Sequence, residues 1–192
     1  MVSLPVSARN RKPRRLSVDE YLRLPDDGSR YELIRGQLVL SPSYFHPHGR
    51  VSLFVGAQLD GFVRQRKLGV VGIETDVVFA EGEVRRPDIH FVSRRRRSII
   101  RSHVYGAPDL VVEITSPGNW QEDIHTKRDD YERFGVREYW VLDIADGRQR
   151  AYAWWRRAGL FHGGEVREPA IRSRVLKGFS LKLAAVWDRA AE

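Results

Sequence analysis

The segment Asp109–Thr115, with the sequence DLVVEIT, decides the fold of this chain. Leu110, Val112 and Ile114 occupy alternate positions and form one fully apolar face. A strand this hydrophobic is expected in the centre of a sheet, with both faces covered. Glu113 stands in the middle of it, where an ionised carboxylate is costly unless it is paired or bound to a metal. The segment therefore predicts a compensating cation near Glu113.

A second strand is expected over Pro87–Val92, PDIHFV. Proline donates no ladder hydrogen bond, so Asp88 is expected where the strand opens. His90 shares a face with Asp88 and is a weaker candidate for contact with the same site. Each carboxylate has an ordinary alternative: a strand-end cap for Asp88, and an exposed face or salt bridge for Glu113.

The helix expected over residues 121–134 supplies a cation. Ile124, Tyr131 and Phe134 form its apolar stripe, and Lys127 falls between them at helical spacing, so Lys127 is expected to point toward the sheet. The alternative is a lysine stem that packs on the sheet with its ammonium group in water. Two carboxylates, Asp88 and Glu113, with a lysine beside them suit a hard divalent cation, Mg²⁺ or Mn²⁺, and the hydrolysis of a phosphate ester.

The rest of the pattern predicts an α/β (α+β mixed) fold with a central mixed β-sheet flanked by helices. Ser17 and Glu20 form a capping-box pattern for a short helix through Leu24. Residues 1–15 are expected to form a basic flexible arm and residues 16–192 a single domain. The other expected elements are an N-terminal hairpin over 31–34 and 37–41, a helix from Pro47 to Leu68, strands over 70–80, 138–144, 149–155 and 159–161 and near Leu181, and a short terminal helix.

The charge and composition limit the class of protein. The formal net charge is +8, and much of the excess lies in the N-terminal arm and in the run Arg94, Arg95, Arg96 and Arg97. Such clusters are typical of proteins that bind nucleic acid, although a solvated arginine-rich surface has the same composition. The chain has no cysteine, which excludes thiolate zinc sites and fits a reducing cytoplasm. No apolar run is long enough to predict a membrane span.

Several segments resemble the Uma2 (DUF820) proteins, which are assigned to the PD-(D/E)XK endonuclease superfamily. These segments are YELIRGQLVLSP (31–42), RPDIHFVS (86–93), GAPDLVVEITSP (106–117), the pair Lys127 and Tyr131, FGVREYWVLD (134–143) and GFSLKL (178–183). Each is short, but their order and spacing cover most of the chain and make the resemblance specific.

The resemblance implies a restriction-endonuclease-like core with a metal site on adjacent strands. It identifies Asp88 as the aspartate of the PD motif and Glu113, 25 positions later, as the acid of the (D/E)XK motif. It further implies that Glu32, on the hairpin, contributes another carboxylate. Because nucleases of this superfamily often dimerise to cut both strands, the resemblance also implies a homodimer.

One position departs from the motif. The lysine of (D/E)XK should stand two residues after the acid, where this chain has Thr115, so Lys127 is expected to supply the charge from the adjoining helix. His48, just before the long helix, could contact the site, but a capping or surface histidine is the favoured interpretation.

These features predict a divalent-metal-dependent endonuclease that acts on DNA. Thr115 keeps open a non-catalytic nucleic-acid-binding module with a degraded nuclease site. The basic arm keeps open a partner-binding component of a toxin or defence system.

Overall fold

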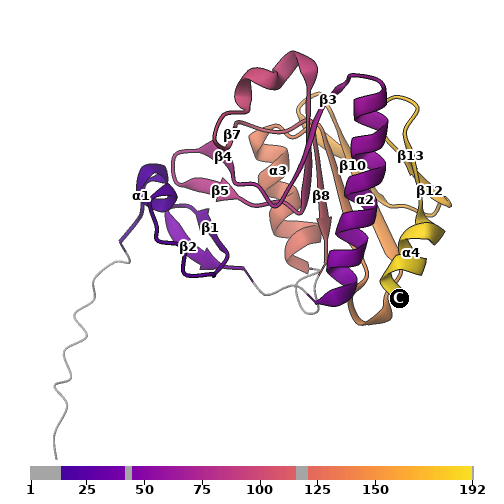
Figure 1. Cartoon of the computed structure of the whole chain (residues 1–192), viewed down its shortest axis with the longest axis horizontal. Helices are drawn as coiled ribbons and strands as arrows, with labels where there is room; N and C mark the ends of the chain where they lie inside the picture. Colours follow the sequence, from indigo (N-terminus) through magenta and orange to yellow (C-terminus); the bar gives the residue numbers. More distant parts are fainter. Residues whose placement is uncertain (1–13, 42–44, 116–120, 192) are drawn as a thin grey trace, which may run out of the picture.

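The computed structural model describes residues 14–41, 45–115 and 121–191 (Figure 1). The expected basic arm therefore lies outside the described residues, except for Arg14, which pairs with Glu20, and Arg15. Within the described ranges, no helix combines the length and the apolar character that a membrane crossing requires.

The larger sheet has six strands in the order β11-β10-β9-β8-β6-β3. These strands are β3 (Gly69–Ile73), β6 (Ile89–Ser93), β8 (Leu110–Ile114), β9 (Glu138–Asp143), β10 (Arg150–Arg157) and β11 (Leu160–Glu165). The apolar segment 109–115 contains β8, which lies in the interior of this sheet. It pairs antiparallel with β6 and parallel with β9, so the sheet is mixed, as predicted.

Helices cover both faces of β8, which explains its apolar sequence (Figure 1). Leu110, Val112 and Ile114 lie in one core cluster with buried residues of α2 (His46–Gln65) and α4 (Leu183–Ala191). Val111 lies in a second cluster on the opposite face, with Ile124 and Tyr131. Those two residues belong to a continuous helical segment formed by the π-helix η2 (Glu122–Lys127) and by α3 (Arg128–Phe134), which ends at Gly135 in the left-handed conformation.

A second sheet of five strands, in the order β2-β1-β5-β4-β7, carries the predicted hairpin. Its strands are β1 (Tyr31–Ile34), β2 (Gln37–Leu40), β4 (Val77–Ala80), β5 (Glu83–Arg85) and β7 (Val104–Tyr105). The short helix α1 (Val18–Leu22) begins with the predicted capping box at Ser17 and packs against this sheet through Val18 and Tyr21. Glu32 and Arg85 thereby come from the smaller sheet, while Glu113 lies on β8 of the larger sheet and Asp88 directly precedes β6.

The single strand expected over residues 70–80 is wrong. The chain divides there into β3 and β4, which join different sheets. Glu74 adopts a φ of 46°, in the left-handed region, and turns the chain between them. β5 pairs antiparallel with β4 and was not expected from the sequence. Arg85 is the last residue of β5, and Arg86 follows it directly before Pro87 and Asp88.

The remaining elements connect or flank the two sheets, and Ile171 and Leu181 join the main core cluster. They are the 3-10 helices η1 (Arg94–Ile99) and η3 (Ala145–Gly147) and the two-stranded sheet of β12 (Ala170–Arg172) and β13 (Ser180–Lys182). The chain therefore has the predicted mixed α/β fold.

Candidate functional site

Asp88 and Glu113 face each other at one end of the β6–β8 pair. The last registered pair is Ile89 with Val112, and one further step along the antiparallel ladder sets Asp88 opposite Glu113. Side chains directly opposite in such a pair have Cβ atoms about 4.5–5.5 Å apart. The backbone N–H of Ile114 donates to Asp88 Oδ2 at 2.6 Å. Both carboxylates are buried, at 2% exposure each, so the local fold brings two acidic groups together away from water.

His48, in the first turn of α2, contacts Asp88. Its Nε2 lies 3.1 Å from Asp88 Oδ2, and its side chain is fully buried. The interpretation of His48 as a capping or surface histidine is therefore wrong, because the start of α2 abuts the end of β6. Burial alone would raise the pKa of Asp88, but His48, Lys127 and the Ile114 amide outweigh burial and lower it. The lowered pKa keeps Asp88 ionised.

Glu113 is held by two groups of the helical segment that covers its face. The Tyr131 hydroxyl donates to Glu113 Oε1 at 2.6 Å, and Lys127 Nζ lies 3.2 Å from Oε2. Burial raises the pKa of Glu113 well above its ordinary value; Asp88 adds to the shift, and Lys127 only partly opposes it. The positive charge of Lys127 therefore does not offset the effect of burial on the pKa of Glu113.

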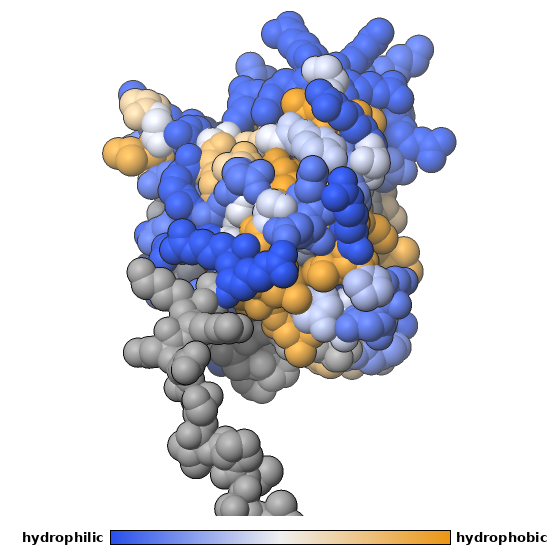
Figure 2. Space-filling view, turned by 90° about the vertical axis from the view of Figure 1, so that its left-hand side faces the viewer, coloured by the Kyte–Doolittle hydropathy of each residue, from blue (hydrophilic) through white to orange (hydrophobic). Residues whose placement is uncertain are grey.

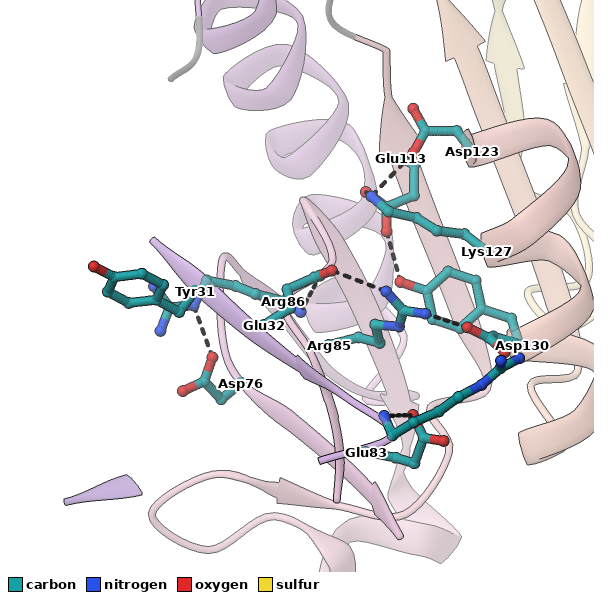
Figure 3. Close-up of polar contacts among 12 residues, drawn as sticks. Tyr31, Glu32, Asp76, Glu83, Arg85, Arg86, Glu113, Asp123, Lys127 and Asp130 are labelled. Carbon is teal, nitrogen blue, oxygen red and sulfur yellow. Dashed lines mark hydrogen bonds and ion pairs between the residues drawn. The ribbon is translucent and has the colours of Figure 1, made fainter. Parts of the chain in front are cut away.

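Lys127 points toward the sheet, as its place in the apolar stripe predicts (Figure 3). Its ammonium group lies between Glu113 and Asp123, with Asp123 Oδ1 at 3.0 Å. Burial would lower the pKa of Lys127, but the surrounding carboxylates outweigh burial and raise the pKa well above its ordinary value, so the group stays charged. Both Lys127 and Asp123 belong to η2, and short π-helical segments are frequent at functional sites.

Glu32 approaches the site from the smaller sheet and is already bound through both oxygens. Arg85 donates to its Oε2 at 3.1 Å, and the Arg86 backbone N–H donates to Oε1 at 2.9 Å. Arg85 is fully buried and also pairs with Asp130 of α3, so it bridges the two parts that carry Glu32 and Lys127 (Figure 3). Burial would raise the pKa of Glu32, but Lys127 and Arg85 outweigh burial and lower it.

Two other candidates do not contact the carboxylate pair. The Thr115 hydroxyl donates to Asp143 Oδ1 at 2.9 Å, so the residue at the usual lysine position is turned toward β9. His90 is buried against Gly72, and burial lowers its pKa to about 4. Among the described residues, no hydrogen bond or ion pair joins His90 to Asp88, so its role as a neighbour of the site stays a prediction.

The structure does not bring the run Arg94–Arg97 to the site. β6 begins beside Asp88 and ends at Ser93, so η1 follows the opposite end of that strand. Six residues separate Asp88 from Arg94, which corresponds to roughly 20 Å along an extended chain. The run Arg94–Arg97 and Glu113 therefore lie at opposite ends of the larger sheet.

The donor atoms fit a divalent cation. Asp88 Oδ1 is a buried carboxylate oxygen without a hydrogen-bond partner in the described part of the chain. Glu32 is paired with Arg85, whereas Asp88, Glu113 and Asp123 are buried near the single ammonium group of Lys127, so these three carboxyl groups outnumber it. No group of three or more acidic or histidine side chains forms a metal cage among the described residues. Mg²⁺ suits such a site because it binds through one or two carboxylates and keeps several waters.

Sequence reasoning missed three groups that organise the site. Tyr131 was assigned to the apolar stripe, but a tyrosine there also carries a hydroxyl that needs a buried partner. Asp123 lies four residues before Lys127, a spacing that predicts an ion pair on a helix. Arg85 follows Val84 on the short strand β5, and the burial of its guanidinium depends on how that strand pairs with its neighbours.

Comparisons with known proteins identify the family and the fold. The Uma2 family, described as "putative restriction endonuclease", matches residues 18–184. A solved structure described as a putative nuclease belonging to DUF820, from Anabaena variabilis, has a similar fold, with a TM-score of 0.77. It is 17% identical, and the match covers 91% of this chain and 99% of that chain. No curated protein matches the chain. Because the family match spans nearly all of the described fold, the chain belongs to the Uma2 family of restriction-endonuclease-like proteins.

Proposed function

We propose that this chain is a Mg²⁺- or Mn²⁺-dependent endonuclease that hydrolyses phosphodiester bonds in DNA in the cytoplasm. The observation that carries the proposal is the buried pair Asp88 and Glu113, opposite each other at the end of β6 and β8, with an Oδ1 on Asp88 that has no hydrogen-bond partner among the described residues. Membership of the Uma2 family supports the same class of reaction.

The residues of the site have separable tasks in this proposal. Asp88 and Glu113 would hold the cation, which supplies positive charge to a phosphate oxygen and makes a nearby water more acidic. His48 and the Ile114 amide hold Asp88 Oδ2, so Oδ1 would be the oxygen of Asp88 that binds the cation. Lys127 has three N–H donors, of which two reach Glu113 and Asp123, so the third can donate to a phosphate oxygen.

The test is the nicking of supercoiled plasmid by purified protein with Mg²⁺, with Mn²⁺ and with EDTA. Asp88→Asn and Glu113→Gln should each abolish nicking, because each removes a charged oxygen ligand. Asp129→Asn is the matched control, since Asp129 is an exposed carboxylate on α3 that pairs only with Arg128 among the described residues. Nicking that survives in Asp88→Asn would identify a contaminating nuclease and contradict the proposal.

A non-catalytic nucleic-acid-binding module is the second candidate. It is favoured by Thr115, which has no positive charge and is turned toward Asp143. A wild-type protein that binds DNA and leaves it intact with every divalent cation would support this candidate. Its DNA affinity would then be the same in Glu113→Gln.

The proposal includes a homodimer, because one site cuts one strand at a time. The edge strand β2 exposes Leu38, Val39 and Leu40, and exposed apolar edge strands are prone to pair with another chain. Sedimentation equilibrium of the wild type and of Leu40→Lys tests this part. A wild-type monomer at all concentrations used for nicking would contradict it.

A further inference from the structure

The end of the six-stranded sheet that lies away from the candidate site is strongly basic. At this end α2 meets β3, β6 meets η1, and the chain enters β9. These connections carry six exposed cationic side chains, which we call the basic end: Arg66, Lys67, Arg94, Arg95, Arg97 and Arg137. Hydrophilic side chains project from the corresponding top of the molecule in Figure 2, which is where η1 lies in Figure 1.

Direct contacts join these segments into one surface. The Arg94 backbone N–H donates to the carbonyl oxygen of Leu68 at 2.7 Å, which ties the start of η1 to the end of α2. Asp109, at the start of β8, accepts from the Ser93 amide at 2.7 Å and from Arg137 at 2.9 Å. β3 and β9 are three strand steps apart in the sheet order, or roughly 14 Å at about 4.8 Å per step.

The charges of the basic end are largely uncompensated. Within the described chain, no acidic side chain pairs with Lys67, Arg94, Arg95 or Arg97. Asp109 is fully buried and engages Arg137 and Arg96, and the buried Glu138 accepts from Trp140, Ser173 and the Arg174 amide. Such unpaired like charges repel each other, and a polyanion would relieve that repulsion.

We propose that the basic end is a second nucleic-acid-binding surface, which holds the phosphate backbone of a duplex about 20 Å from the candidate cleavage site. This inference rests on the proposed function, because it takes the substrate of the site to be a nucleic acid. The surface would bind without sequence preference and would add affinity only for substrates long enough to reach it.

The chemistry of the surface favours nucleic acid over an acidic protein. Five of its six cations are arginines, whose planar guanidinium groups bind phosphate through two parallel hydrogen bonds. Duplex DNA carries one charge per about 1.7 Å of axis, so a 14 Å stretch presents about eight phosphates to the six cations. None of the strongly exposed apolar side chains lies on residues 64–69 or 93–99. A protein interface would need an apolar centre there, whereas a phosphate backbone does not.

Distance sets the expected dependence on substrate length. A duplex rises by about 3.4 Å per base pair, so roughly six base pairs separate the two ends of the sheet. A duplex of 30 base pairs can contact both places, whereas a duplex much shorter than about six base pairs, bound at the candidate site, does not reach the basic end.

The experiment measures binding without catalysis, by fluorescence anisotropy of a 30-base-pair duplex in EDTA over a series of salt concentrations. The test variant is the triple substitution Arg94→Ser, Arg95→Ser and Arg97→Ser. Its matched control removes the same charge from exposed residues around β12 and β13, by Arg172→Ser, Lys177→Ser and Lys182→Ser. All substituted side chains are exposed, and circular dichroism verifies that each variant is folded.

The triple variant at the basic end should reduce the slope of log Kobs against log salt by up to about 2.7, which is about 0.9 for each lost phosphate contact. The control should keep the wild-type slope. A second variant, Lys67→Ser with Arg137→Ser, should reduce the slope by up to about 1.8 on the same basis.

An unchanged slope in both basic-end variants, or an equal fall in the control, would overturn the inference. Displacement of the duplex by poly-L-glutamate at equal charge concentration would also overturn it, in favour of an acidic protein partner. Because the assay contains no divalent cation, its result is independent of whether the protein nicks plasmid. Failure of the second surface and failure of the nuclease proposal can therefore be told apart.

Discussion

Substitution of Lys127 by methionine removes the ammonium group from the centre of the candidate site and retains most of the side chain's length. Lys127 Nζ lies 3.2 Å from Glu113 and 3.0 Å from Asp123, and the lysine side chain is 16% exposed. Breaking a buried ion pair costs about 3–5 kcal/mol, because it leaves an uncompensated buried charge. For this partly accessible lysine we expect the lower figure, about 3 kcal/mol at pH 8.

The loss should depend on pH, and its sign follows from the pKa of Glu113. Burial raises that pKa well above the value in the unfolded chain, and removal of Lys127 raises it further. A group of this kind contributes stability that is fully present below its unfolded pKa and is lost as the pH rises through its folded pKa. In Lys127→Met the buried carboxyls can protonate at low pH, so the variant should be much closer to the wild type near pH 5 than at pH 8.

Thermal unfolding followed by circular dichroism measures this effect. For a chain of 192 residues, each kcal/mol shifts Tm by about 2–4 °C, so Lys127→Met should lower Tm by roughly 6–12 °C at pH 8. Lys177→Met is the control, because it removes an exposed lysine. An equal loss at pH 5 and pH 8, or a loss below about 1 kcal/mol as for an exposed pair, would refute the assignment of Lys127 as a buried counter-charge.

Three further substitutions test the surroundings of the site. Arg85→Met should destabilise the protein by about 3–5 kcal/mol in urea unfolding, because removal of the fully buried guanidinium leaves its carboxylate partners unpaired. A loss of stability under about 1 kcal/mol would contradict the assignment of Arg85 as a bridge between them. Gly72→Ala should lower the free energy of unfolding by about 1–3 kcal/mol in the same assay, since a Cβ atom there would lie 2.4 Å from His90 Cε1. If β3 and β6 pair in this register, adding His90→Ala should recover most of the lost stability. Thr115→Lys should fail to restore plasmid nicking to a protein that lacks Lys127, because position 115 is turned toward Asp143; restored nicking would show that the motif position still reaches the site.

The local pattern of the sequence predicts the parts of the site that lie on single elements. The alternation in β8 correctly separates Leu110, Val112 and Ile114 from Val111, and these groups pack in different core clusters. The position of Lys127 within an apolar helical stripe correctly predicts that it points at the sheet. Periodicity succeeds in these cases because each element must bury one face against its neighbour.

Features that depend on pairing between distant segments could not be predicted in this way. Arg85 is buried because β5 pairs with β4 and because Asp130 approaches from α3, and no local pattern encodes either contact. His48 reaches Asp88 because of where α2 begins relative to β6. The turn at Glu74 separates two apolar segments whose sequence predicts one continuous strand. A single residue in the left-handed conformation does not change the hydrophobic pattern enough to predict the turn.

An anomalous difference map from crystals soaked in MnCl₂ would locate the cation directly. If Asp88 and Glu113 bind it, a manganese peak should lie at bonding distance from Asp88 Oδ1 and beside the Glu113 carboxylate, and Asp88→Asn should remove the peak. A map without a peak at this pair, or a peak there that persists in Asp88→Asn, would contradict the assignment of Asp88 and Glu113 as the metal ligands.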